Sequence, residues 1–218
     1  MANPARPPVG LLFPDQYREA AGVLGRAFVD DPLLKAIVPP IAQTDERARA
    51  MSRLFEVVLR LHRREGQPVW GAMHDGKVVA AAVVEYRDKP PSAAATVLHG
   101  LPQLPALLGT LGWSGVRRAI ATLDTLERNR PSEPHFYLNI LGVEPSFQRH
   151  HFGVAILDRL WAEAALRPGF AGVYLETATE ANVAYYSARG YRVLNEIFPL
   201  GVRMWRMLQS PLELASRH

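Results

Sequence analysis

Hydrophobic residues at helical spacing mark two segments in the first third of the chain. Apolar side chains recur every three or four residues over 15–28 and again over 44–64, which puts them on one face of a helix in each segment. Between the two segments, Asp31 precedes Pro32, a pair typical of a helix cap followed by a proline in the first turn. The pattern therefore predicts three helices before residue 65.

Runs of β-favouring residues follow these helices. Two of the runs flank Asp75-Gly76, a dipeptide typical of a tight hairpin turn. From His135 onward the periodicity changes repeatedly, and it predicts the order strand, helix, strand, helix, strand, strand. We expect the last two strands to form a hairpin that turns near 199–201.

The predicted strand over 135–143 alternates in a regular way. Because successive side chains of a strand point to opposite faces, the alternation predicts the residues on each face. One face is expected to carry Phe136, Leu138 and Ile140. The other is expected to carry Tyr137, Asn139, Leu141 and Val143.

Residues 92–130 differ from the rest of the chain. They are rich in Ala and Leu with internal Gly and Pro, and they predict two or three helices inserted into a single domain that spans 1–218. We expect the apolar stripe of the last helix to pack against the core, with a cap over a substrate cleft or a homodimer face as alternatives. The stripe consists of Trp113, Val116, Ile120, Leu123 and Leu126.

Composition and charge exclude several classes of function. The chain has 218 residues, a net charge of +4 that comes almost wholly from scattered arginines, and no cysteine. Charge that is scattered along the chain argues against a nucleic-acid-binding tail, which would show a block of like charges. The lack of cysteine excludes disulfides, thiolate metal sites and a cysteine nucleophile. No apolar run approaches the ~20 residues of a membrane span, and the first residues do not resemble a signal peptide. We expect a cytoplasmic protein that binds neither nucleic acid nor membrane.

The stretch VEPSFQRHHFGVAILDRL, residues 143–160, is the candidate ligand site. A strand that enters a helix through a tight turn leaves several backbone N–H groups unpaired at the positive end of the helix dipole, and such turns bind phosphate. The stretch lacks the glycine-rich loops of nucleoside triphosphate and dinucleotide folds. It therefore predicts a phosphate-bearing ligand of another kind.

The same stretch carries a family resemblance. LGVEPSFQRHHFGVAIL resembles the acetyl-CoA signature of the GNAT acetyltransferase superfamily, in which V-x-P leads to Q/R-x-x-G-x-G/A. Four positions match and one does not, since a histidine stands where the family has its first glycine. The matching residues are Val143, Pro145, Gln148 and Gly153, and the departure is His151.

A second stretch strengthens the resemblance. LETATEANVAYYSARGY is similar to a family pattern of an Asn, then a Tyr, then Gly followed by an aromatic residue. Asn182, Tyr186, Gly190 and Tyr191 stand at the corresponding positions. The two stretches also occur in the family's order, one helix and one strand apart.

The resemblance implies a fold and a co-substrate. The fold would be α+β (α/β), with a mixed, mostly antiparallel central sheet flanked by helices, and splayed strands would form a cleft for acetyl-CoA. Loop amides would bind the pyrophosphate and the splayed strand the pantetheine arm, while Gly142 fits a close approach of ligand and backbone. The cofactor-binding residues would be Leu141, Gly142, Val143, Gln148, Arg149, His150, His151, Phe152, Gly153, Val154, Asn182 and Tyr186.

The resemblance also implies direct transfer of the acetyl group to an amine, with Tyr186 as the general acid. A phenol near pKa 10 can protonate a thiolate near pKa 8.5 at a cost of about 2 kcal/mol, so tyrosine is adequate in this role. We expect the neighbouring Tyr185 to point elsewhere on the helix. Glu176 is the candidate general base, and an ion pair with an arginine is its equal alternative.

Two asparagines and His151 have less specific roles at this stage. We expect Asn139 to orient substrate or water, and Asn182 to bond either the CoA arm or the start of its own helix. A β-carbon at His151 obstructs the pyrophosphate if the backbone is left-handed, but not if it is helical. The helical case is compatible with CoA, and we expect binding that is weakened and sensitive to pH.

The sequence thus predicts an N-acetyltransferase that moves an acetyl group from acetyl-CoA to a primary amine of a small molecule or peptide. One alternative is a non-catalytic module that binds or senses CoA through a degenerate pyrophosphate loop. Another is an inactive fold that serves as an interaction domain. No metal site is expected, because adjacent histidines such as His150 and His151 rarely reach one ion.

Overall fold

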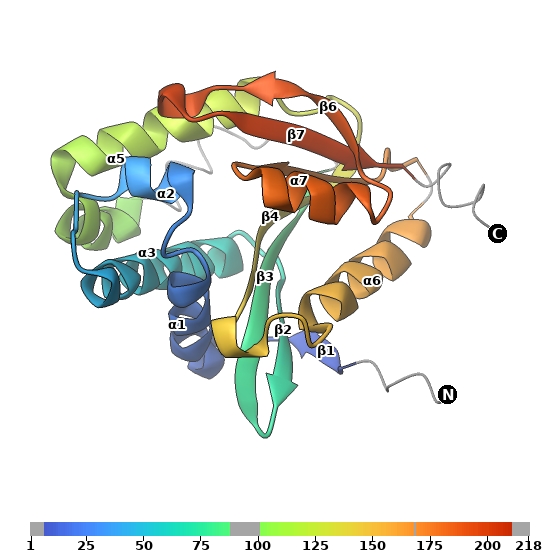
Figure 1. Ribbon diagram of the computed structural model, residues 1–218, viewed down its shortest axis with the longest axis horizontal. Coiled ribbons are helices and arrows are strands. Elements are labelled where there is room, and N and C mark those ends of the chain that lie inside the picture. Colours follow the sequence, from blue (N-terminus) through green and yellow to red (C-terminus); the bar gives the residue numbers. More distant parts are fainter. Residues whose placement is uncertain (1–6, 88–100, 168, 211–218) are drawn as a thin grey trace.

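The predicted strands form one central sheet in the computed structural model, which describes residues 7–87, 101–167 and 169–210 (Figure 1). The strand order is β1-β2-β3-β4-β5-β7-β6, and the one parallel pair is β4 with β5. This confirms the mixed, mostly antiparallel sheet. The strands are β1 Val9–Leu11, β2 Val69–His74, β3 Lys77–Arg87, β4 His135–Val143, β5 Val173–Thr177, β6 Arg192–Ile197 and β7 Met204–Gln209.

Helices cover both faces of the sheet (Figure 1). Side chains from α1, α2, α3 and α5 share one apolar core with β2 and β3, whereas α6 contributes to a second core on the opposite face. The sequence did not predict β1, which is only three residues long. The helices are α1 Tyr17–Ala27, α2 Pro32–Ile37, α3 Thr44–Arg64, α5 Leu104–Arg128, α6 Phe152–Ala165 and α7 Glu180–Ser187.

Local signals in the sequence produce the expected turns. Asp75 and Gly76 join β2 to β3 with φ values of 49° and 75°, which is the positive-φ pair that a tight hairpin needs. Asp31 caps α2, because its Oδ1 accepts a hydrogen bond of 2.9 Å from the Leu34 N–H while Pro32 occupies the first turn. The final hairpin turns through Pro199–Gly201, as predicted.

Strands β4 and β5 separate shortly after they begin. They pair only at Phe136 with Val173 and at Tyr137 with Tyr174, although β4 continues to Val143. The later residues of β4 therefore have free backbone groups on the side that faces β5. This is the splay that a ligand arm could enter.

A β-bulge at Asn139 contradicts part of the predicted alternation. The register between β3 and β4 shifts at this point, since Val83 pairs with Ile140 and Val84 with Leu138. Ile140 consequently packs in the core on the α1 face, whereas Leu138 packs in the core on the α6 face. The prediction that the two residues share a face is wrong, because the extra residue of a bulge reverses the orientation of those that follow.

The helical middle consists of a short 3-10 turn and α5, which is broken at Gly112 by a φ of 63°. Residues 92–100 of the predicted insertion lie outside the described residues. Within the predicted stripe of α5, Val116 and Leu126 are buried, but Trp113 is 70% exposed. Ile120 and Leu123 are also exposed, so the stripe does not pack uniformly against the core.

Gly142 allows α1 to approach β4 closely. A β-carbon at this position would lie 2.7 Å from Leu24 Cδ2 and 3.1 Å from Ala27 Cβ, both on α1. The helix is also tied to the end of β4 by Arg26, whose guanidinium contacts the Glu144 carboxylate at 2.6 to 3.0 Å. The close approach expected at Gly142 is thus made by a helix, which forms one wall of the site described next.

None of the helices within residues 7–87, 101–167 and 169–210 combines the length and the hydrophobicity that crossing a membrane requires.

Candidate active site

Two cavities lie on either side of the splayed end of β4. The first, which we name the turn cavity, has a volume of about 720 Å³ and lies between the end of α1, the turn that precedes α6, and α7. The second, which we name the apolar chamber, has a volume of about 340 Å³ and lies among α2, α3, α5 and the middle of β4. The two cavities meet, because five residues line both of them: Phe28, Asp31, Leu141, Asn182 and Tyr186.

The turn cavity gathers most of the residues predicted to bind the coenzyme. His150 is an exception, since it does not line the cavity and its Nδ1 lies 2.9 Å from the Gln148 carbonyl oxygen. Glu176, the candidate base, lines the apolar chamber instead. The predicted residues that line the turn cavity are Leu141, Gly142, Val143, Gln148, Arg149, His151, Phe152, Gly153, Val154, Asn182 and Tyr186.

The turn before α6 has an unusual backbone. His151 is the N-cap of α6 and has φ 64° and ψ 6°, and Arg149 also has a positive φ of 67°. Of the two cases considered for His151, the structure thus has the left-handed one, in which a β-carbon obstructs the pyrophosphate, and not the helical one. Position 151 has the left-handed conformation that glycine adopts without strain and that a residue with a β-carbon adopts less readily. Gly153 follows inside the first turn, where a β-carbon would touch Val143 and the Tyr185 hydroxyl.

Substitutions at position 151 should distinguish the effect of the backbone conformation from the effect of the imidazole. We expect His151→Gly to be more stable than His151→Ala by about 1 kcal/mol, because alanine keeps the strain that a β-carbon causes at a positive φ and glycine removes it. Acetyl-CoA should bind His151→Gly at least about threefold more tightly than wild type, because the β-carbon that obstructs the pyrophosphate in the left-handed conformation is removed while the backbone N–H groups remain. Thermal unfolding and calorimetric titration measure the two effects. A loss of coenzyme binding in the glycine variant would show that the imidazole itself is required.

Tyr186 lies at the junction of the two cavities. Its side chain is 9% exposed and packs at 5.3 Å, between ring centroids, against Tyr191. Burial raises the pKa of the Tyr186 phenol, and the charge of Arg189 opposes this only in part. The phenol is therefore a protonated donor that lies between the turn cavity and the chamber.

Asn182 also lies at the junction, and it does not cap its own helix. Thr179 is the N-cap of α7, and its Oγ1 accepts a hydrogen bond from the Asn182 N–H at 3.4 Å. The side chain of Asn182 lines both cavities. The cap of α7 is thus Thr179, and contact of Asn182 with a ligand stays a prediction.

The apolar chamber carries few charged groups. Glu176 is one of them, and its Oε1 accepts a hydrogen bond of 2.8 Å from the Tyr174 hydroxyl. Burial raises the pKa of Glu176, while the charge of Arg130 and the phenol hydrogen bonds lower it in part. A carboxylate with a raised pKa can accept a proton near neutral pH, but this one lines only the chamber.

Comparison with known families decides the identity of this fold. The model of the acetyltransferase (GNAT) family matches residues 39–191. The chain belongs to the GNAT acetyltransferase family. The matched region contains the splayed strands, the turn before α6 and Tyr186, so the resemblance found in the two sequence stretches is confirmed.

Solved structures share this GNAT fold at low sequence identity. A histone acetyltransferase HPA2 and related acetyltransferase from Corynebacterium glutamicum has a TM-score of 0.69 and 20% identity, over 94% of this chain and 97% of that one. A polyamine N-acetyltransferase from Drosophila melanogaster has a TM-score of 0.57 and 15% identity, over 93% and 99%. A ribosomal-protein-alanine N-acetyltransferase from Brucella melitensis has a TM-score of 0.54 and 14% identity, over 93% and 99%. At these identities the likeness shows the fold and leaves the acceptor open.

Sequence reasoning missed several residues that line the turn cavity of this GNAT fold. Tyr185 was expected to point elsewhere, yet it lines this cavity beside Tyr186. Arg189 stacks on Tyr185, with its guanidinium carbon 3.5 Å from the ring centroid, and it lines the same cavity. Tyr185 lies at the end of α7 and Arg189 in the turn that follows it, and their separation of four residues could have indicated a shared face.

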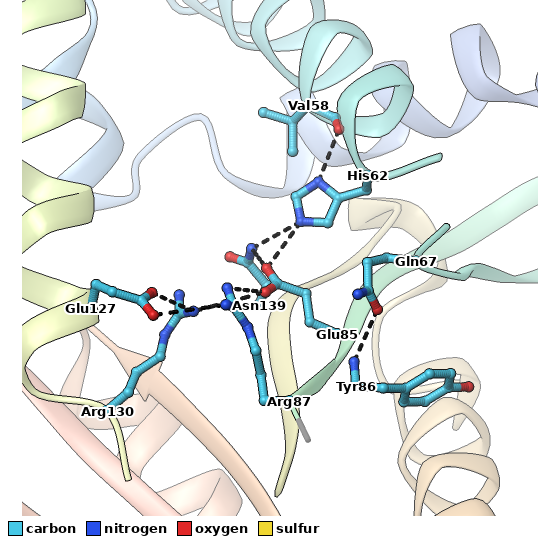
Figure 2. Close-up of polar contacts among 9 residues, drawn as sticks. All are labelled: Val58, His62, Gln67, Glu85, Tyr86, Arg87, Glu127, Arg130 and Asn139. Carbon is cyan, nitrogen blue, oxygen red and sulfur yellow. Dashed lines mark hydrogen bonds and ion pairs between the residues drawn. The ribbon is translucent and has the colours of Figure 1, made fainter. Parts of the chain in front are cut away.

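A buried charged network supports the inner end of the chamber (Figure 2). His62 on α3 and Asn139 on β4 line the chamber, and both contact Glu85 Oε1 on β3, at 3.0 Å and 2.7 Å. Arg87 forms an ion pair with the second oxygen of Glu85, and Arg130 lies 3.8 Å from it. The network joins two helices and two strands around one carboxylate that is 5% exposed.

The hydrogen bonds of the network favour the protonated form of His62. Its Nδ1 lies 3.0 Å from the Val58 carbonyl oxygen and its Nε2 lies 3.0 Å from the Glu85 carboxylate, so both ring nitrogens face acceptors. Burial lowers the pKa of His62, but the hydrogen bond and charge of Glu85 raise it more. Burial alone would raise the pKa of Glu85. The hydrogen bond and charge of His62 and the charges of the two arginines have a larger, opposite effect and lower the pKa to about 2.

The network should give stability a defined pH dependence. His62 has a raised pKa in the folded protein, so its contribution is complete below the unfolded pKa of 6.5 and is lost as the pH rises through the folded value. Glu85 contributes above its unfolded pKa of 4.5, and this is lost as the pH falls through about 2. We therefore expect the difference in unfolding free energy between wild type and His62→Gln to shrink between pH 6 and pH 10. Denaturant unfolding measures it, and an unchanged difference would contradict the charged state of His62.

The described part of the chain has no group of three or more His, Asp and Glu side chains that could hold a metal ion.

Proposed function

We propose that this protein is an acetyl-CoA-dependent N-acetyltransferase, built as one domain, that acts directly on a primary amine. One observation supports it most strongly: the turn cavity and the apolar chamber meet beside the splayed edge of β4, where Leu141 and, from α7, Tyr186 line both. Coenzyme in one cavity and amine in the other would bring the thioester and the nucleophile together at this point. Effective alignment of two reactants is a large part of the catalysis of group transfer.

The turn cavity fits the coenzyme in shape and charge. Backbone N–H groups at the start of α6, with the positive end of the helix dipole behind them, would hold the pyrophosphate. Arg149 and Arg189 line the cavity and would add positive charge. From Leu141 to Val143, β4 pairs with β3 but not with β5, and its backbone on the β5 side would bond the pantetheine arm and supply an oxyanion donor.

The groups at the junction and in the chamber would then have separate tasks. The neutral amine forms a bond to the thioester carbonyl carbon, and the carbon–sulfur bond breaks as the tetrahedral intermediate collapses. The amine proton would pass to a carboxylate of the chamber or to water, with Glu176 as the base expected from the sequence. The proton of Tyr186 would pass to the departing thiolate, which leaves CoA as a thiol.

Release of free thiol from acetyl-CoA tests this function. Purified protein is incubated with acetyl-CoA and a panel of primary amines, and the thiol is followed by a chromogenic disulfide while mass spectrometry identifies the acetylated amine. We expect thiol release that depends on both substrates and a product that is heavier by one acetyl group. Thiol release without an acetylated amine would leave only hydrolysis and would contradict the proposal.

A non-catalytic module that binds or senses CoA is the second candidate. It is favoured by the histidine at position 151, where the side chain lines the cavity that would hold the pyrophosphate. Under that alternative, acetyl-CoA raises the melting temperature but no amine is acetylated. A coenzyme present at 100 times its Kd stabilises a protein by ~2.7 kcal/mol, so a thermal shift detects binding independently of turnover.

A further inference from the structure

The apolar chamber has the walls of a site for a hydrophobic molecule. Aliphatic and aromatic side chains from α2, α3, α5 and β4 surround it, among them Leu33, Phe55 and Leu111, which are 9%, 2% and 1% exposed. Its volume of about 340 Å³ is sufficient for a small ligand, since ligand pockets begin near ~300 Å³. A molecule with several charges would have to lose their hydration there without replacement.

Asp31 is an anionic group at the entrance of the chamber. It is partly buried and lines both cavities together with Tyr186. Its Oδ1 accepts the Leu34 N–H, and among residues 7–87, 101–167 and 169–210 it forms no ion pair with a cationic side chain. The adjacent Asp30 differs, since it is 72% exposed in its side chain and pairs with Arg47 at 3.0 Å and Lys35 at 3.8 Å.

The other two charged side chains that line the chamber already have protein partners. Glu176 accepts a hydrogen bond from Tyr174 and lies in the field of Arg130, and it does not line the turn cavity. His62 is paired with Glu85. In the described part of the chain, Asp31 is therefore the charged group of the chamber that is both available to an external cation and located at the junction with Tyr186.

We propose that the acceptor is an amphipathic primary amine, whose ammonium group binds Asp31 at the junction and whose apolar body fills the chamber beneath α5. This assignment names the substrate class of the proposed function, and acetylation of the amine rests on that function. Binding of the amine depends on the chamber alone. One carboxylate at the entrance and apolar walls beyond it match a ligand with one positive charge at one end. A polyamine fits poorly, because its second ammonium group would be buried among hydrocarbon side chains.

A matched pair of acceptors tests the apolar body. 4-Phenylbutylamine and spermidine have similar lengths and each carries a primary amine, but spermidine carries further charges. We expect kcat/KM for 4-phenylbutylamine to exceed that for spermidine by at least about 10-fold in the thiol-release assay. If spermidine is acetylated as well or better, the proposed acceptor class is wrong while the acetyltransferase function stands.

A matched pair of variants tests the role of Asp31, with binding of 4-phenylbutylamine measured by calorimetry in the absence of coenzyme. Asp31→Asn removes the charge and retains an oxygen that can cap α2, and we expect it to raise the Kd at least about 10-fold. Asp30→Asn removes the same charge one residue away, from a side chain that does not line the chamber, and should leave the Kd within about twofold of wild type. The neutral 4-phenylbutan-1-ol should bind wild type and Asp31→Asn equally. Equal amine affinity in the two variants would overturn the assignment.

The binding measurement also distinguishes failure of the amine site from failure of the acetyltransferase function. If 4-phenylbutylamine binds in an Asp31-dependent way but no amine is acetylated, the acetyltransferase proposal fails and the chamber remains an amine site. If amines are acetylated but 4-phenylbutylamine does not bind, the inference fails and the function stands.

Discussion

Replacing Tyr186 with phenylalanine is expected to lower kcat for amine acetylation by about 10²- to 10⁴-fold, with a much smaller change in the KM for acetyl-CoA. The phenol lies where the turn cavity meets the apolar chamber, and loss of a positioned general acid typically has an effect of this size. The phenylalanine ring retains the packing against Tyr191. Steady-state kinetics with acetyl-CoA and an amine measure both constants.

Tyr191→Phe is the matched control for this substitution. Tyr191 is a buried tyrosine of the same aromatic cluster, it is 3% exposed, and it lines neither cavity. Its kcat should stay within about threefold of wild type. Tyr185→Phe should change the KM for acetyl-CoA more than kcat, because Tyr185 lines only the turn cavity. The assignment of the general acid fails if Tyr186→Phe retains as much activity as Tyr191→Phe.

The pH dependence of kcat provides a second test of the role of Tyr186. Burial raises the pKa of Tyr186 above its ordinary value of 10.0, so the phenol keeps its proton throughout the range in which the enzyme is assayed. Deprotonation of Tyr186 should therefore cause no fall in kcat below about pH 10. The raised pKa also makes transfer to the thiolate more costly than the ~2 kcal/mol estimated for an ordinary phenol. Direct stabilisation of the departing sulfur by other groups of the turn cavity would have to offset this.

Features coded by neighbouring residues could be predicted from the sequence. The Asp75-Gly76 turn and the Asp31-Pro32 cap each depend on two residues with strong conformational preferences, and both formed as expected. The strand–helix order after His135 followed from hydrophobic periodicity. Most of the predicted coenzyme residues line the turn cavity, because the turn and the splayed strand that carry them are adjacent in the chain.

Features that depend on contacts between distant residues could not be predicted. The bulge at Asn139 depends on register with β3, and no property of the alternating stretch indicates an extra residue. The left-handed backbone at His151 reflects the turn as a whole, because residues other than glycine rarely have a positive φ, even histidine, which is enriched among those that do. The location of Asp31 between the two cavities depends on how α2 packs against α5 and against the turn of the final hairpin, which are distant in the sequence.

The charged network around Glu85 also depends on contacts between residues that are distant in the sequence. Glu85→Gln should lower the free energy of unfolding by about 3–5 kcal/mol, because the isosteric amide leaves three buried or partly buried cations without their central anion. For a chain of this length, that corresponds to a fall of at least about 6 °C in the melting temperature. Thermal and denaturant unfolding at pH 6, where His62 is charged, measure it.

Glu127→Gln provides the control, because it removes a carboxylate from the edge of the same network. Glu127 lies 2.7 Å from Arg130 but its side chain is 43% exposed, so water can replace the lost partner and the cost should stay below about 1 kcal/mol. Glu85→Gln and Glu127→Gln each remove one negative charge near Arg130, but only Glu85→Gln removes it from the protein interior. The difference in unfolding free energy between the two variants therefore measures the effect of burial. Adding His62→Gln to Glu85→Gln should recover part of the lost stability, because it removes one of the unpaired cations. If Glu85→Gln costs no more than Glu127→Gln, the network does not hold α3 and α5 to the sheet in the way that its geometry indicates.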